Sequence, residues 1–226
     1  GVNYFNPEYE IYTRYSYSSN EKKGLSNPVV GRTIEDRDGN LWIGTEGGGL
    51  NYYNRRTREF KWYRPQEGRN SISHNNVKAL YYDADKEIIW IGTHLGGLNK
   101  LDIRSGHFTH YRMEEGNPNT LPSDIIRDII PYKSLLIIAT QNGVCLFDPA
   151  NGQCQQLFKD SKEGKSIKMV ADVTFDSEGT LWIAATGEGV FSYRFDTCRL
   201  TNYRHDATNP NSLSNNNVNN ITQDSK

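Results

Sequence analysis

The chain has 226 residues, and its 26 Lys and Arg against 27 Asp and Glu give a formal net charge of −1. Without a basic excess, broad electrostatic binding of nucleic acid is excluded, and no apolar run reaches the roughly 18–20 residues of a membrane-spanning helix. With 20 Gly, 14 Tyr, 23 Asn and only 8 Ala, the composition favours turns and strands and excludes a helical bundle.

The chain is organised by an internal repeat with a period of about 47 residues. A Leu-Trp-Ile-Gly-Thr segment at 41–45 returns at 89–93, at 136–140 in weaker form, and at 181–185. The central positions of these segments are spaced 48, 47 and 45 residues apart and are Trp42, Trp90, Ile137 and Trp182. A glycine-containing segment follows each of them at a fixed offset. Several landmarks on one period predict a repeat architecture.

In chain order, residues 1–20 match the third and fourth strands of a repeat unit and are predicted to form a part-unit. Within the second complete unit, apolar and β-branched runs separated by Asp, Asn and Gly turns predict four antiparallel strands. Residues 217–226 match the first strand of a further unit. The four complete units between these ends are predicted at about 28–64, 76–112, 124–159 and 168–204.

A lone four-stranded sheet leaves two apolar faces uncovered, and radial packing of such sheets gives a β-propeller. The sequence therefore predicts an all-β, partial β-propeller over residues 1–226, with about four complete four-stranded blades and part-blades at both ends. The large residue of each second strand is predicted to fill the space between adjacent blades. Gly44 and Gly92 are predicted to let neighbouring backbones approach. The recurring Asp36, Asp83 and Asp176 are predicted to cap amides of the turns that they begin.

The segment 34–45, followed by Gly-Gly-Leu-Asn at 48–51, resembles the two-component regulator propeller repeat. The resemblance extends along the chain and is weakest in the third unit, where Ile137 replaces the tryptophan. It implies a periplasmic ectodomain of an inner-membrane sensor whose parent protein is a hybrid histidine kinase. It also implies an oligosaccharide signal, control of polysaccharide utilisation, and self-association of receptor ectodomains. No phosphoacceptor histidine box or ATP-binding segment is found in the chain, so this fragment is expected to have no kinase activity. We also expect it to be non-enzymatic and to contact neither membrane nor nucleic acid.

The sequence predicts neither a metal site nor a cofactor. His107 and His110 lie three apart on a predicted strand, so they point to opposite faces and cannot share a metal. The glycine run at 47–49 precedes a strand instead of a helix, so we interpret it as a turn and not as a phosphate loop. Cys145 and Cys154 flank a predicted hairpin turn and could be near neighbours, and we interpret them as buried or half-buried thiols.

Ligand binding is predicted at the mouth of the propeller channel, on the loops between second and third strands and between blades. Trp62 is a candidate for stacking against a sugar ring, and its alternative role is an outer-strand residue that covers the blade edge. Two other functions stay open: a glycoside hydrolase or lyase, and a protein-binding scaffold. The polar candidates chosen by position are Glu46, His94, Gln141, Asn142, Glu188, Arg69, His74, Asn75 and Asn119.

Overall fold

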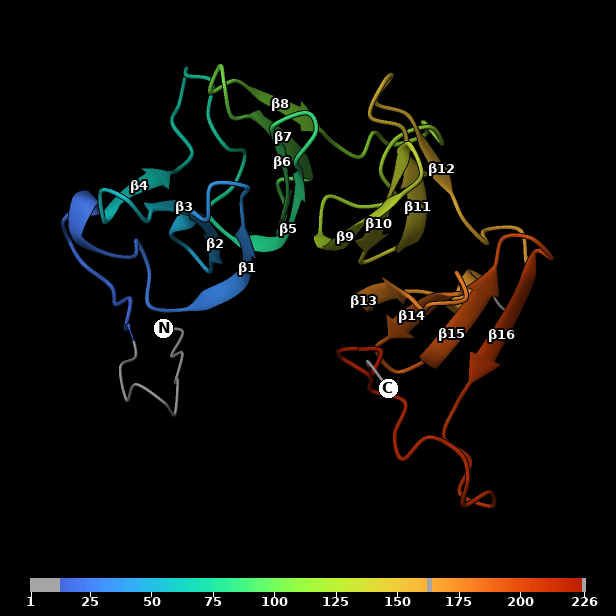
Figure 1. The fold of residues 1–226 in the computed structure, drawn as a ribbon. Coiled ribbons are helices and arrows are strands. Elements are labelled where there is room, and N and C mark those ends of the chain that lie inside the picture. The colour runs from blue at the N-terminus through green and yellow to red at the C-terminus, as the bar shows by residue number, and fades with distance from the viewer. Residues whose placement is uncertain (1–12, 162–163, 225–226) are drawn as a thin grey trace. The chain divides into compact units, whose positions relative to one another are not determined.

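A computed structural model describes residues 13–161 and 164–224 (Figure 1). Among these residues it has sixteen strands and two short 3-10 helices, η1 (Glu21–Lys23) and η2 (Gly164–Ser166). The strands form four antiparallel sheets of four strands each, which confirms the all-β prediction. The chain divides into two compact units, residues 1–110 and residues 111–226.

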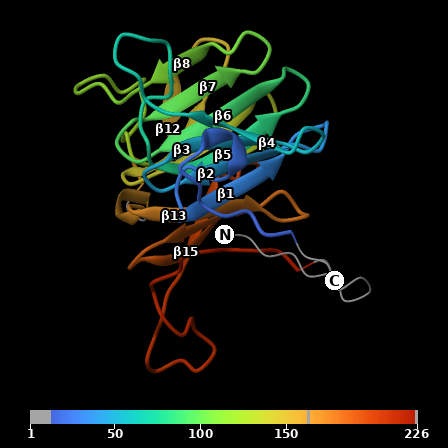
Figure 2. The same cartoon turned by 90° about the vertical axis from the view of Figure 1, so that its left-hand side faces the viewer.

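The first unit contains two sheets, each with its strands side by side in chain order (Figures 1 and 2). Short turns join these strands, and all contain Asp or Gly except the turn at 55–58, which is Arg-Arg-Thr-Arg. The first sheet is β1 (Val30–Glu35), β2 (Leu41–Thr45), β3 (Gly49–Asn54) and β4 (Glu59–Tyr63). The second is β5 (Val77–Asp83), β6 (Ile88–Thr93), β7 (Leu98–Asp102) and β8 (Phe108–Tyr111).

The second unit repeats the same meander twice. The outer strand of the third sheet, β12, has only three residues, whereas the outer strands of the first and fourth sheets, β4 and β16, have five each. The third sheet is β9 (Ile126–Tyr132), β10 (Leu135–Thr140), β11 (Gly143–Phe147) and β12 (Cys154–Gln156). The fourth is β13 (Val170–Phe175), β14 (Leu181–Ala185), β15 (Gly189–Arg194) and β16 (Arg199–Tyr203). Each of the four sheets falls within one of the predicted blade ranges.

Apolar side chains fill the space between the two sheets of the first unit. Trp42 and Leu50 of the first sheet form one buried cluster with Ile89, Ile91 and Leu101 of the second. Trp42 is only 1% exposed, so its indole occupies the space between blades that the repeat reserves for it. A Cβ atom on the neighbouring Gly44 would lie 2.7 Å from a Val77 methyl, so only glycine permits this approach.

In the second unit, Ile137 occupies the position that the other blades give to tryptophan. It is fully buried in a cluster with Val173, Ile183 and Phe191 of the fourth sheet. Surrounding aliphatic and aromatic side chains thus fill the volume that an indole would take, so the third blade is packed despite its divergent sequence. Trp182, at the same position of the fourth sheet, is partly exposed.

The predicted part-blade at 1–20 lies partly outside the described residues, which begin at 13. Residues 13–20 form no strand; Tyr17 makes an isolated parallel bridge with Leu25. Tyr15 covers part of the first sheet, with its ring 4.7 Å from that of Tyr53 and 5.9 Å from that of Phe60.

Residues 217–224, predicted to begin the next blade, also form no strand. A strand is stable only when its amides and carbonyls find a partner strand, and among the described residues no strand pairs with this segment. Its position is nevertheless that of a first strand. The Ile221 amide donates to Asp172 Oδ2 at 2.8 Å, as the Val173 amide donates to Asp128 Oδ2 at 3.4 Å one blade earlier.

Candidate functional site

Two of the three recurring aspartates anchor a turn to the tryptophan of the next strand. Asp36 Oδ1 accepts from the backbone amides of Asp38 and Asn40 at 3.0 and 2.9 Å, and its Oδ2 accepts from the Trp42 indole at 3.1 Å. The capping that the sequence predicts is present, and the indole bond is an additional contact. Each such carboxylate therefore fixes both the turn and the residue that packs between blades.

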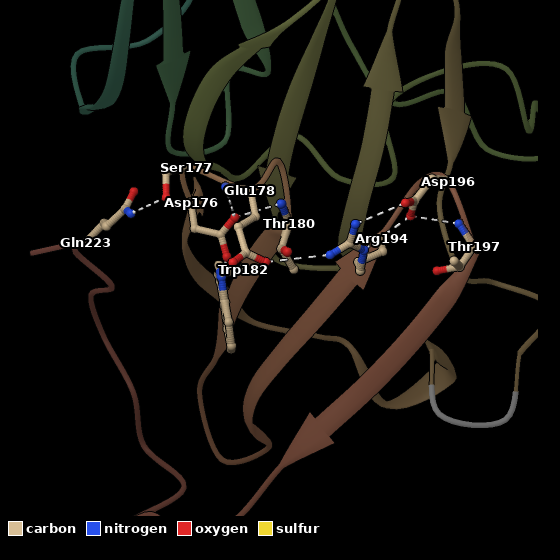
Figure 3. A network of polar contacts seen from close by, with 9 residues as sticks. All are labelled: Asp176, Ser177, Glu178, Thr180, Trp182, Arg194, Asp196, Thr197 and Gln223. Carbon is tan, nitrogen blue, oxygen red and sulfur yellow. Dashed lines mark hydrogen bonds and ion pairs between the residues drawn. The ribbon is translucent and has the colours of Figure 1, made fainter.

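Asp176 makes the same contacts in the second unit (Figure 3). Its Oδ1 accepts from the Glu178 and Thr180 amides, and its Oδ2 accepts from the Trp182 indole at 2.8 Å. Partial desolvation raises the pKa of Asp176, but the bonds from the indole and the turn amides outweigh it and hold the pKa below its ordinary value. Beside this turn, Arg194 pairs with Asp196 at 3.0 Å.

Asp83 departs from this arrangement. Its carboxylate contacts Lys86 instead, with Oδ2 2.9 Å from the Lys86 ammonium and Oδ1 3.3 Å from the Lys86 amide. Asp83 and Trp90 are seven residues apart, whereas Asp36 and Trp42 are six apart. The additional residue places Asp83 at the end of β5, paired with Ile88. The bond to the indole is therefore common to Asp36 and Asp176 but not to Asp83.

Two pairs of reciprocal hydrogen bonds between serine and asparagine hold the inter-blade loops against the third strands. The Ser26 amide donates to Asn51 Oδ1, and Asn51 Nδ2 donates to Ser26 Oγ, both at 2.8 Å. Ser73 and Asn99 make the same reciprocal pair, again at 2.8 Å. Both asparagines are fully buried. Each serine precedes its asparagine by about 25 residues, and only the structure shows that the two bind each other.

Four of the candidate ligand residues meet around the loop at 73–76 in the first unit. The Asn75 carbonyl accepts from the Gly47 and Gly49 amides, and Glu46 forms an isolated bridge with Asn76. The His94 amide donates to the Asn76 carbonyl at 2.9 Å, and His74 Nδ1 accepts from the Asn76 amide at 3.0 Å. We call the surface formed by Glu46, His74, Asn75, His94 and Leu95 the 73–76 loop face.

Charge on the 73–76 loop face is partly balanced. Glu46 is ion-paired with Lys78, which the sequence analysis did not single out. The Glu46 side chain is 44% exposed and the Lys78 side chain 23%. The pair therefore presents one carboxylate and one ammonium to solvent at the edge of this surface.

Leu95 is an unexpected member of the 73–76 loop face. It is 55% exposed and has a φ of 77°, in the left-handed region. Gly47 and Gly187 occupy the corresponding turn position in the first and fourth blades, with φ of 96° and 84°. An exposed leucine thus stands where the turn favours glycine, and such strained residues concentrate at binding sites. The mismatch with the other units is the sequence signal that could have identified it.

The candidates of the second unit form two separate groups. The Gln141 carbonyl accepts from the Met169 amide at 2.7 Å, and Asn142 Nδ2 donates to the Pro122 carbonyl at 3.3 Å. Glu188 is instead ion-paired with Arg204, the residue that follows β16. Glu188 lies in the turn between β14 and β15, whereas Gln141 and Asn142 lie in the turn between β10 and β11.

The remaining candidates have contacts of their own. Arg69 bonds to Gln66 within its loop, and the Asn119 carbonyl accepts from the Cys154 amide at 2.8 Å. The Trp62 indole donates to the Gly24 carbonyl at 2.9 Å, and the Arg64 guanidinium lies 4.5 Å from the centre of its ring. The ring therefore covers the blade edge, and one of its faces is occupied by Arg64.

An apolar hollow of about 930 Å³ lies on the free face of the first sheet, entirely within the first unit. Val30, Ile43 and Tyr53 contribute to its lining, with Thr33 and Arg55 among the polar residues. By strand alternation this face corresponds to the face of the second sheet that packs on Trp42. It is thus a blade-packing face, and among the described residues Tyr15 covers part of it.

In the described part of the chain, no three His, Cys, Asp or Glu side chains are grouped as metal ligands. Over the same residues, no helix has the length and apolar character needed to cross a bilayer.

Comparisons with known proteins agree with the repeat. A sequence model of the two-component regulator propeller matches residues 24–47 and 71–94. Two segments of the chain thus match the two-component regulator propeller repeat. Each matched segment runs from an inter-blade loop through the first two strands of a blade, and includes the Asp turn and the tryptophan strand. A comparison with curated proteins gives no match.

Two solved structures share the fold. One is the extracellular domain of the hybrid two-component system BT3049 from B. thetaiotaomicron, with 22% identity and a TM-score of 0.70 over 95% of this chain. The other is the extracellular domain of the one-component system BT4673 from the same organism, with 22% identity and a TM-score of 0.70 over 88% of this chain. This chain spans 33% and 27% of their lengths. The four sheets are thus blades of a β-propeller, as predicted.

Proposed function

We propose that this chain is part of the periplasmic sensor region of a two-component regulator and that it binds an oligosaccharide through the 73–76 loop face. The observation that carries the proposal is the match of the two-component regulator propeller to the first two blades. Two proteins of the same fold, described as extracellular domains of one- and two-component systems, support it. Control of polysaccharide utilisation through a parent histidine kinase is part of the same proposal.

The chemistry of the 73–76 loop face suits a sugar. His74, Asn75 and His94 supply imidazole and amide groups that exchange hydrogen bonds with hydroxyls. Leu95 supplies an exposed apolar surface beside them, on which the C–H face of a pyranose ring can pack. The backbone groups of the loop are already bonded to each other, so recognition falls to the side chains.

The same surface favours binding over hydrolysis. Glycoside hydrolysis requires two carboxyl groups that flank the scissile bond, about 5–9.5 Å apart. The residues that define this surface include one carboxylate, Glu46, which is ion-paired with Lys78. We therefore propose that the fragment senses its ligand and does not cleave it.

Isothermal titration of the chain with a panel of plant and host oligosaccharides tests this proposal. We expect one member of the panel to bind, and His94→Ala to weaken that binding about tenfold through the loss of one hydrogen bond to the ligand. His107→Ala is the matched control, because His107 is exposed in the turn before β8 and lies outside the 73–76 loop face. Silent titrations with folded protein, or equal losses in both variants, would overturn the assignment of this surface.

Self-association of the ectodomain is the second part of the proposal, and the apolar hollow on the first sheet, which residues 13–161 and 164–224 cover only in part, is the surface that we assign to it. We propose that a second copy of the chain covers this apolar face, because the equivalent face of the second sheet is buried by a neighbouring blade. Thr33 is exposed and lines the hollow, so Thr33→Arg should block association without disturbing the core. Sedimentation velocity should show a concentration-dependent dimer that this variant loses; a monomer at every concentration would contradict the proposal.

A further inference from the structure

Two buried thiols lie beside each other in the third blade. Cys145 in β11 and Cys154 at the start of β12 have their sulfur atoms 3.4 Å apart. Phe147 pairs with Cys154 and Cys145 pairs with Gln156, so the cysteines are diagonal neighbours on one face of the hairpin. Cys145 is 0% exposed and Cys154 is 4% exposed. Both are free thiols in the structure.

We propose that Cys145 and Cys154 form a disulfide bond when the chain folds in an oxidising compartment, and that this bond joins β12 to β11. The periplasmic location on which this rests belongs to the proposed function. The oxidant is the disulfide of a thiol–disulfide oxidoreductase of that compartment. One cysteine thiolate attacks that disulfide and forms a mixed disulfide, and the second cysteine displaces the oxidoreductase thiolate. The two cysteines lose two protons and two electrons, and the oxidoreductase disulfide is reduced to a dithiol.

The geometry of the hairpin allows the bond. The sulfur atoms must approach from 3.4 Å to about 2.05 Å. The outer strand β12 has three residues and is joined to β11 by a turn at 148–153, so it has freedom to move the remaining distance. The third sheet also has the shortest outer strand of the four. A cross-link here secures the shortest outer strand of the four sheets.

Burial indicates when the bond forms. Desolvation raises the pKa of the Cys145 thiol well above its ordinary value, so the folded protein contains little of the reactive thiolate. Oxidation therefore occurs during folding, before the core closes over the two thiols. Once formed, the bond is shielded from reductants by the same burial. Cys198 is exposed and is the internal control for a thiol that stays accessible.

Oxidative refolding tests the proposal independently of cellular location and of any ligand. The reduced, denatured chain is refolded in a glutathione redox buffer, then denatured with an alkylating reagent and digested for peptide mass spectrometry. We expect the Cys145 and Cys154 peptides to be joined with the loss of two hydrogens and Cys198 to be alkylated. Free Cys145 and Cys154 after this treatment would overturn the proposal, and so would a bond from either one to Cys198.

A stability measurement separates the cross-link from a chance oxidation. The bond closes a ten-residue segment, for which chain entropy predicts an increase in melting temperature of about 5–10 °C over the reduced form. Cys198→Ser should retain this difference, and Cys154→Ala should abolish it. An oxidised form that melts no higher than the reduced form would contradict the proposed role. Failure of the oligosaccharide titrations would leave both results unchanged, so the two proposals fail separately.

Discussion

The turn that precedes each tryptophan strand allows a sharp test of what holds the blades together. In the first blade, Asp36→Ala removes the acceptor of the Trp42 indole and of the Asn40 side chain and amide. Trp42 is 1% exposed and Asn40 is 7% exposed, so water cannot readily replace the lost acceptor. In the second blade, Asp83→Ala removes only contacts with Lys86.

The expected difference follows from burial. Leaving a buried donor without an acceptor costs about 1–3 kcal/mol. The Trp42 indole and the Asn40 side chain are two such donors after Asp36→Ala, whereas water can reach the backbone amides of the turn. We therefore expect Asp36→Ala to lower the free energy of unfolding by about 2–6 kcal/mol. The Asp83–Lys86 pair includes a lysine that is 59% exposed, so Asp83→Ala should cost less than about 1 kcal/mol.

Thermal unfolding followed by circular dichroism measures both variants. At about 2–4 °C for each kcal/mol, Asp36→Ala should lower the melting temperature by about 4–24 °C. The double variant with Trp42→Phe should show a coupling of about 1 kcal/mol, because both changes remove the same hydrogen bond. Equal losses for Asp36→Ala and Asp83→Ala, or strict additivity with Trp42→Phe, would refute the argument that the indole bond matters.

Three further comparisons test the packing of the blades. Trp42→Ala should lower the free energy of unfolding by about 3–5 kcal/mol. Because Trp182 is partly exposed, Trp182→Ala should lower it by at least about 1 kcal/mol less than Trp42→Ala does. Urea denaturation measures both losses. Gly49 and Gly106 both have a positive φ, but of the two only Gly49 would place a Cβ 2.2 Å from a backbone oxygen. Gly49→Ala should therefore lower the free energy of unfolding by more than about 3 kcal/mol, and Gly106→Ala by about 1 kcal/mol. Equal melting temperatures of the two variants would contradict this. Because the pKa of Asp176 is held below 3.8 in the folded state, its stabilising effect is present above that pH and lost as pH falls through the lower folded pKa. Asp176→Asn should therefore flatten the acid side of the stability curve, and an unchanged slope would count against that role.

The fold could be predicted from the sequence because the repeat places the residues that pack between blades at the same position in each of four segments. Trp42 and Ile137 differ in type but lie at the same strand position, and period alone locates both. Periodicity does not identify which side chains bind each other. The different contacts of Asp83 depend on one additional residue in its turn, which the sequence shows as a spacing of seven instead of six before the tryptophan.

The candidate site was predictable in its location and less so in its members. Glu46 and His94 lie at one repeat offset, so the loops that carry them are expected to occupy equivalent positions in neighbouring blades. Leu95 was missed because an apolar residue beside a strand is usually interpreted as core. Its exposure depends on a left-handed backbone, which a leucine side chain does not indicate. The glycines at the same offset in the first and fourth units, Gly47 and Gly187, do indicate this backbone conformation.

The structure also explains why binding residues can vary on these loops without loss of the fold. The carbonyl of Asn75 accepts from the amides of Gly47 and Gly49, and the carbonyl of Asn216 accepts from those of Gly187 and Gly189. These two asparagines are 141 residues apart, or about three repeat periods. Backbone groups thus make the contacts that hold one blade's loop to the next, and they are available whatever side chain is present. The side chains beside them are free to differ from blade to blade, so residues that break the repeat at these offsets are where ligand specificity is expected to reside.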